Sequence, residues 1–303
     1  SLFVFSSIRA ISQYTVQEIL EMGIDGFWIG YEGTRSNYAK QQGRPAAEVL
    51  REFRQNGIIA LTSMVIGFDY QTPAIISEEL HGLLDLHPTL TQILIYGPVP
   101  GTPFYERILK ENRMHEHLAQ NPEEYYRVAD GFTPMVKHPT MEPAEISNLQ
   151  QWAFKEDFEQ LGPSVYRALE TWFFGYLKYR ASDNLFLKSK AMQFAREIRK
   201  SYPIFLAGRI LAPNAHVREW ITQLQKNIHK ELGRPNVFER ILSGLAFGFA
   251  LWTQFKLSFN LFQHPSLVRR TYRHPGFVMP GGPMLPDLDL LRTLPQNSIP
   301  AGD

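Results

Sequence analysis

The 303-residue chain contains no cysteine. A disulfide, a thiolate nucleophile and a cysteine-ligated metal or cluster are therefore excluded within the chain itself. An excess of one charge is missing as well, because 31 Lys and Arg residues stand against 30 Asp and Glu residues. This balance gives no global reason to expect a nucleic-acid partner, and we expect none.

The sequence also lacks a recognisable export signal and a long apolar run. No charged start followed by an apolar stretch and a small-residue cleavage site is present, so we expect a cytoplasmic protein. The chain enters an apolar segment at Leu2 without a polar lead, as we expect of an excerpt from a longer chain. What is present, with 44% hydrophobic residues, is enough for one large or two ordinary globular domains.

Four short apolar segments alternate with helical patterns in the first 96 residues. We predict strands at 2–6, 27–30, 58–66 and 91–96, and helices at 15–22, 45–55 and 72–86. Thr15 followed by Glu18 is a capping-box pattern, and Pro45 is typical of a first helical turn. Consecutive βα units give a parallel sheet, whose strands all end at the edge where such folds bind ligands.

From Phe104 onward the periodicity is helical. We predict helices at 106–118, 122–129, 144–160, 164–180, 187–201, 215–232 and 237–262, followed by an extended tail rich in Pro and Gly. The predicted organisation is an α/β unit at 1–112, a connection at 113–143, an all-helical C-terminal domain at 144–275 and a tail at 276–303.

Three turn-rich clusters end the last three predicted strands. They read WIGYEG (28–33), MVIGFDYQT (64–72) and ILIYGPVPGTP (93–103). In this order and spacing, over roughly Leu2 to Leu109, they resemble the second half of a radical S-adenosylmethionine core, and in particular its cobalamin-binding branch. The resemblance implies a partial TIM-like (β/α) barrel in which the four predicted strands are the third to the sixth.

The resemblance implies that residues at these strand ends bind S-adenosylmethionine, but it identifies no catalytic residue. Glu32 would contact the ribose or amino group, since a carboxylate accepts strong hydrogen bonds from both. A cation after the first or second predicted strand could pair with the methionine carboxylate. The complete implied set is Glu32, Ile66, Gly67, Asp69, Tyr96, Gly97, Pro98, Arg9 and Lys40.

The family's chemistry also requires a [4Fe–4S] cluster held by three cysteines, which this chain lacks. The resemblance therefore implies that the cluster, and cobalamin where it is used, are bound outside this chain. The missing N-terminal half of the barrel would be supplied in cis or in trans. By itself the chain is not expected to cleave S-adenosylmethionine reductively. The substrate would be a small or lipid-like molecule covered by the helical domain.

Simpler interpretations compete for several of these residues. Asp69 could cap the helix predicted near Thr72, and Arg9 and Lys40 could be solvated surface charges. His115 and His117 lie in a predicted helix, where residues two apart point to different sides, so we assign no metal site to them. An ordinary TIM-like enzyme with a phosphate or sugar ligand at the same strand ends is a rival, although the PGTP turn lacks the donors for a phosphate.

A second rival is a non-catalytic or membrane-associated interaction module built on the helical half. Between Lys178 and Arg240 there are 13 Lys and Arg residues against five Asp and Glu residues. The uncharged run Ile241–Trp252 follows. Its 12 residues are fewer than the roughly 20 that span a bilayer. We favour a buried core helix for this run, with peripheral membrane contact as the alternative.

Overall fold

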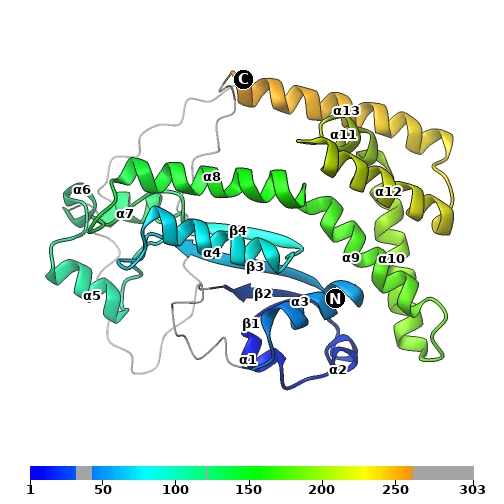
Figure 1. The fold of residues 1–303 in the computed structure, drawn as a ribbon, viewed down its shortest axis with the longest axis horizontal. Coiled ribbons are helices and arrows are strands. Elements are labelled where there is room, and N and C mark those ends of the chain that lie inside the picture. Colours follow the sequence, from blue (N-terminus) through cyan, green and yellow to red (C-terminus); the bar gives the residue numbers. More distant parts are fainter. Residues whose placement is uncertain (32–42, 121, 260, 262–303) are drawn as a thin grey trace, which may run out of the picture. The chain divides into compact units, whose positions relative to one another are not determined.

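Four parallel strands lie side by side in their sequence order: β1 (Leu2–Ser6), β2 (Ile24–Gly30), β3 (Ile59–Ile66) and β4 (Leu90–Ile95) (Figure 1). The computed structural model describes residues 1–31, 43–120, 122–259 and 261, which all lie in one compact unit spanning residues 1–263. The predicted α/β class and the four parallel strands are confirmed. β1 and β4 are the two edges of this sheet.

Four helices lie between the strands; three of them begin at a side-chain cap, and the third in chain order begins after Pro45 without one. They are α1 (Ile8–Ile11), α2 (Val16–Glu21), α3 (Ala46–Gln55) and α4 (Pro73–Asp85). Thr15 and Glu18 form the predicted capping box at the start of α2. The Thr72 hydroxyl caps α4 by accepting the amide hydrogen of Ile75, and Pro73 occupies the first turn.

These helices cover one face of the sheet. Side chains at alternate strand positions, such as Phe27, Ile29, Met64, Ile66 and Ile93, are buried in clusters with residues of α1 to α4. Successive side chains of a strand point to opposite faces of the sheet. The apolar residues at alternate positions therefore share one face and pack against the helices that connect the strands. A hydrophobic core of the α/β unit therefore lies between the sheet and these helices.

The opposite face of the sheet, which we call the bare face, is less covered. Strand register places Phe3, Phe5, Trp28, Leu61 and Leu94 on it. Phe5 is 75% exposed and stacks on Trp28 with ring centroids 4.5 Å apart. Trp28, Leu61 and Leu94 are only partly buried. An apolar sheet face of this kind is usually covered by further polypeptide.

The two edges of the sheet differ. At the β4 edge the amide of Ile95 donates to the carbonyl oxygen of Gly131 (2.7 Å). The side-chain amide of Gln150 donates to the carbonyl oxygens of Ile93 (2.8 Å) and Gly131 (2.9 Å). Within the described part of the chain, β1 pairs with β2 alone. One edge is therefore capped and the other is open to pairing.

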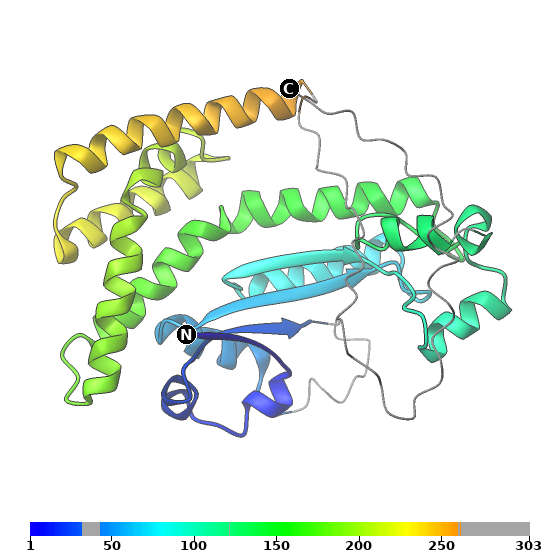
Figure 2. The same ribbon diagram turned by 180° about the vertical axis from the view of Figure 1, so that it is seen from behind.

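The rest of the described chain is helical. Its elements are α5 (Pro103–Lys110), α6 (Glu116–Gln120), α7 (Pro122–Val128), α8 (Pro143–Leu161), α9 (Ser164–Tyr179), α10 (Leu185–Lys200), η2 (Tyr202–Ile204), α11 (Phe205–Ile210), α12 (Ala215–Leu232) and α13 (Val237–Ser258) (Figure 2). The predicted helices from residue 144 onward agree with α8, α9, α10, α12 and α13 apart from their ends. The short η2 and α11 were not predicted.

The single helix predicted at 106–118 is wrong. The chain leaves α5 through Asn112, whose φ of 52° does not continue a helix. Residues 113–115 then pair with residues 135–137: the amide of Lys137 donates to the carbonyl oxygen of Arg113 (2.7 Å), and that of His115 to Met135 (3.2 Å). This pairing with a segment more than 20 residues away ends the helix.

Helices α8 and α9 pack on the sheet and share its buried clusters. Gly175 of α9 approaches Gly57, just before β3, so closely that a Cβ on Gly175 would lie 2.7 Å from the Cα of Gly57. The hydroxyl of Tyr179 donates to the side-chain oxygen of Asn56. The predicted boundaries at 112 and 143 thus separate segments that are in direct contact.

A buried ion pair joins α8, α9 and β4. Arg167 donates to both carboxylate oxygens of Asp157 (2.9 and 2.8 Å) and to the carbonyl oxygen of Pro88 (3.1 Å). The hydroxyl of Thr91 donates to the same carboxylate at 2.7 Å. The side chains of Arg167 and Asp157 are only 8% and 11% exposed. Removing either partner would leave the other as an unpaired buried charge, which strongly destabilises a folded protein.

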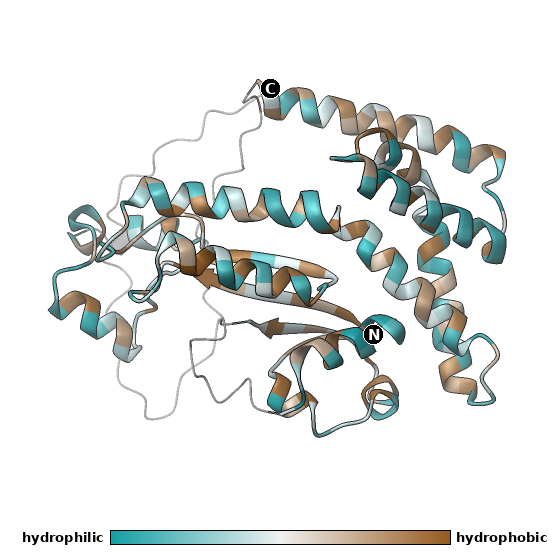
Figure 3. Ribbon diagram, viewed as in Figure 1, coloured by the Kyte–Doolittle hydropathy of each residue, from teal (hydrophilic) through white to brown (hydrophobic). Residues whose placement is uncertain are grey.

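The run Ile241–Trp252 is not a buried core helix. It belongs to α13, which has no buried residue. One side of α13 contacts η2 and α11, whereas large apolar residues such as Leu245, Phe249 and Trp252 are exposed. Brown, hydrophobic residues recur along the ribbon of this helix (Figure 3). The predicted end of this helix at Phe262 lies outside the described residues, as does the predicted tail.

We expect Asp157→Ala to lower the free energy of unfolding by about 3–5 kcal/mol, because Arg167 would keep a buried charge without a counter-ion. Chemical denaturation of the purified chain measures this. Lys155→Ala removes one partner of the exposed Lys155–Glu159 pair (3.8 Å) and should change stability by at most about 0.5 kcal/mol. Equal effects in the two variants would contradict the role given to the buried pair.

Candidate functional site

The ends of β3 and β4 meet at the carboxyl edge of the sheet. The amide of Tyr96 donates to the carbonyl oxygen of Ile66 (2.8 Å), which places Gly67 beside Tyr96. Gly67 has a φ of 94°, a conformation that side chains with a Cβ rarely adopt. The structure therefore brings together Gly67, Tyr96 and Gly97, three of the residues predicted to bind the adenosyl group.

The turn after β3 is held from within by Gln71. Its side-chain oxygen accepts the amide hydrogens of Gly67 (2.7 Å) and Phe68 (2.9 Å). Its side-chain nitrogen donates to Glu79 of α4 (2.7 Å). Gln71 is 1% exposed. Two backbone donors that point out of this turn are thus satisfied by the protein itself.

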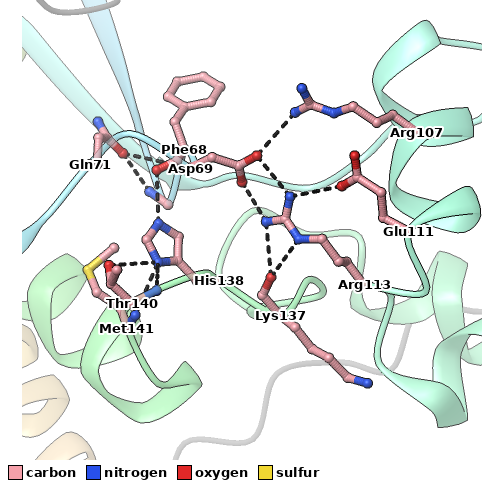
Figure 4. A network of polar contacts seen from close by, with 11 residues as sticks. Phe68, Asp69, Gln71, Arg107, Glu111, Arg113, Lys137, His138, Thr140 and Met141 are labelled. Carbon is pink, nitrogen blue, oxygen red and sulfur yellow. Dashed lines mark hydrogen bonds and ion pairs between the residues drawn. The ribbon is translucent and has the colours of Figure 1, made fainter.

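Asp69 forms the centre of a second polar cluster (Figure 4). The guanidinium of Arg113 donates to both of its carboxylate oxygens, at 2.5 and 2.8 Å, and Arg107 donates to one of them at 3.2 Å. Arg113 also donates to the carbonyl oxygen of Lys137 at 3.0 and 3.1 Å. Hydrogen bonding from Arg113 lowers the pKa of Asp69. Asp69 does not cap α4, since Thr72 does.

His138 ties the same turn to the start of α8. Its Nδ1 accepts the amide hydrogens of Thr140 (3.2 Å) and Met141 (3.1 Å). Its Nε2 therefore carries the proton and donates to the carbonyl oxygen of Phe68 (2.9 Å). The turn after β3 is bonded on three sides, by Gln71, Arg113 and His138.

Aromatic and apolar side chains fill the space around Tyr96. Its ring lies 4.8 Å from that of Phe68 and meets Phe104 edge-on at 4.4 Å. A Cβ on Gly97 would lie 3.4 Å from the sulfur of Met135. Pro98 is buried, and its carbonyl oxygen accepts the hydroxyl hydrogen of Tyr125. This wall is mostly aromatic and apolar, with the hydroxyls of Tyr96 and Tyr125 as its polar side-chain groups.

Two of the other predicted ligand residues, Ile66 and Arg9, do not join this group. The side chain of Ile66 is fully buried in the cluster with α4 and α8, away from the bare face. Arg9 is exposed on α1. Glu32 and Lys40 lie outside the described residues. Just before them, Tyr31 turns its hydroxyl toward Gly82 of α4, where burial and the nearby Glu79 raise its pKa.

The space between these residues is small. A cavity of about 10 Å³ is lined by Gly67, Asp69, Tyr96 and Arg113, together with residues 134–136 and His138. Larger cavities, of about 290 and 650 Å³, lie toward the amino ends of the strands, around His87–Thr89 and around Phe3 and Leu90. Among the residues that the structure describes, the cavity between the ends of β3 and β4 is too small to enclose a purine.

The described residues contain no group of three or more His, Cys, Asp or Glu side chains arranged to hold a metal ion. His115 and His117 stack with ring centroids 6.0 Å apart, and His115 precedes α6 rather than lying in a helix. In the part of the chain that the structure describes, no helix has both the length and the apolar content needed to cross a bilayer.

No protein-family model matches the sequence, and a search of curated proteins finds no significant match.

Sequence reasoning missed the partners that hold the site. Arg113 and His138 come from the connecting segment and lie 44 and 70 residues from their partners Asp69 and Phe68. No local pattern marks them. The role of Gln71 could have been predicted, because a polar side chain within residues 64–72 can hydrogen-bond to the nearby backbone of the same turn.

Because the pKa of Asp69 is lowered below its ordinary value of 3.8, this carboxylate stabilises the fold above about pH 4 and loses that contribution as the pH falls through its folded pKa. We expect Asp69→Asn to be less stable than the parent chain at pH 7, with a difference that shrinks on acidification. Urea denaturation at several pH values measures this.

Asp183→Asn is the matched control. Asp183 is exposed and forms no ion pair with the described residues, so its replacement should leave stability nearly unchanged at every pH. A stability difference for Asp69→Asn that stays constant from pH 7 to about pH 3 would show that the charge on Asp69 is not what holds Arg113.

Proposed function

We propose that this chain is the S-adenosylmethionine-binding and substrate-covering portion of a radical S-adenosylmethionine enzyme, in which its four strands form half of a TIM-like barrel. The observation that carries the proposal is the arrangement of the sheet. Four consecutive parallel strands place their crossover helices on one face and leave the other face apolar and partly exposed. In a barrel, that second face lines the interior.

The unequal edges support an incomplete barrel. The β4 edge is capped by Gly131 and Gln150, so no further strand is needed there. The β1 edge carries exposed Leu2, Phe3 and Phe5. An exposed apolar edge strand is a site for pairing with further polypeptide. The first half of the barrel, in cis or in trans, would pair with β1.

The iron–sulfur cluster does not fit this chain. The sequence has no cysteine, and the described acidic and histidine side chains form no cluster that could replace three thiolates. The cluster, and any cobalamin, would be ligated by the other polypeptide. No chemical step is therefore assigned to residues of this chain.

S-adenosylmethionine fits the chain in part. Gly67, with no Cβ, and the aromatic wall of Phe68 and Tyr96 suit one side of a flat adenine ring. The polar groups of Asp69 and of the 67–68 amides are already bonded within the protein. The ligand would therefore rest on the end of the bare face, with its second wall supplied by the missing half. Binding by this chain alone should be weak.

Calorimetric titration with S-adenosylmethionine tests the site through two glycines. Gly67 and Gly101 both have positive φ, 94° and 84°, so alanine costs similar backbone strain at each. A Cβ on Gly101 meets nothing within 4 Å. We expect Gly67→Ala to weaken binding roughly tenfold, about 1.4 kcal/mol, and Gly101→Ala to leave it unchanged. Equal affinities in both variants would remove Gly67 from the site.

The resemblance predicts a second effect in the same titration. Glu32→Ala should abolish the measurable heat, because a carboxylate bond to the ribose or amino group would be lost. Glu48→Ala removes a charge from an exposed position of α3 and should bind as the parent chain does. The absence of binding by the parent chain even at millimolar ligand would contradict the proposed function.

A further inference from the structure

Helix α13 presents a continuous apolar surface to the outside. Its large side chains are well exposed, among them Leu245 (66%), Phe249 (71%) and Trp252 (54%). Eight of them, which we call the α13 face, lie on one side of the helix: Val237, Phe238, Ile241, Leu245, Phe249, Leu251, Trp252 and Phe255; Leu257 is also exposed but lies outside this side. At about 100° per residue these positions cover close to half of the helix circumference. A patch of this size marks a contact surface.

The helix is held so that this face points away from the protein. Its other side contacts η2 and α11. At its start, Asn236 and Glu239 form a capping box. Glu239 also pairs with Arg199 of α10, through hydrogen bonds of 2.8 and 2.9 Å. The α13 face therefore runs lengthwise along the helical domain and can be laid flat against a planar surface.

The charges around the α13 face are positive. After Glu239 the next acidic residue is Asp287, and the only charged residues of α13 beyond Glu239 are Arg240 and Lys256. The ammonium of Lys256 lies 5.9 Å from the centre of the Trp252 ring. A long cationic side chain over an interfacial tryptophan is the arrangement that lets the charge reach lipid headgroups while its stem stays in apolar surroundings.

The segment before α13 adds to this charge, with 13 Lys and Arg residues against five Asp and Glu residues between Lys178 and Arg240. A dimer formed through α13 would bring the positive charges of two copies together. Two packed helices would also bury only a narrow stripe of each other and leave much of the α13 face exposed. Among the described helices, none meets the requirements for crossing a bilayer. An anionic surface that accepts a whole helix side matches both the charge and the width of the face.

We propose that the α13 face binds the surface of an anionic membrane, with the helix in the plane of the interface. Its aromatic and aliphatic side chains enter the boundary between headgroups and acyl chains, and Arg240 and Lys256 meet lipid phosphates. Membrane binding by the α13 face does not depend on S-adenosylmethionine. It would keep the helical domain at the membrane whatever ligand binds at the sheet.

Flotation with vesicles tests this on the full chain. The chain should float with phosphatidylcholine vesicles that contain about one third phosphatidylglycerol, and much less with phosphatidylcholine alone. Binding should fall in about 1 M salt, where the Debye length is about 3 Å. Leu245→Glu/Phe249→Glu should lower the bound fraction at least about tenfold, since both side chains lose their apolar burial.

The control variant is Leu185→Glu/Met192→Glu, which adds the same two charges at exposed positions of α10 and should float like the parent chain. Trp252→Phe supplies a second measurement: subtracting its emission from that of the parent isolates Trp252, which should shift to the blue with anionic vesicles. Failure of the parent chain to float, equal loss in both double variants, or a dimer in light scattering that only Leu245→Glu/Phe249→Glu dissolves would overturn the proposal.

Discussion

The structure depends on a constraint of parallel sheets: each strand must be reached by a crossover connection, and here every crossover in the described chain runs over the same face. The helices α1 to α4 bury one apolar side of the strands, and the other described residues cover the second side only in part. Gly131 and Gln150 cap the β4 edge, whereas the described residues leave the β1 edge open, so the sheet can be extended beside β1. The proposed half-barrel follows from this asymmetry rather than from any single residue.

The carboxyl ends of β3 and β4 are fixed by bonds that come from elsewhere in the chain. Arg113 and His138 tie the turn after β3 to the connecting segment, and Gln71 satisfies its backbone. Because its polar groups are already hydrogen-bonded within the protein, such a turn can form a rigid wall of a binding site. The same bonds limit its part in binding a ligand: the polar contacts to a nucleoside would have to come from the segment after β2 or from another polypeptide.

Much of the fold could be predicted from the sequence because its signals are local. The capping box at Thr15, the proline at 73 and the apolar strands all act within a few residues. Contacts between distant segments could not be read in this way. The helix after Pro103 ends because residues 113–115 pair with 135–137, and Asp69 pairs with Arg113 instead of capping α4. The exposure of α13 was mispredicted because a helix that is apolar on nearly all sides has no periodicity to show which side is buried.

Hydrogen–deuterium exchange of the chain with and without saturating S-adenosylmethionine would show where on the backbone the ligand binds. We expect slower exchange at the ends of β3 and β4, in residues 66–71 and 96–98, and in the segment that contains Glu32. Protection confined to the cavity around His87–Thr89 and Trp220, or no protection anywhere, would contradict the proposed binding site.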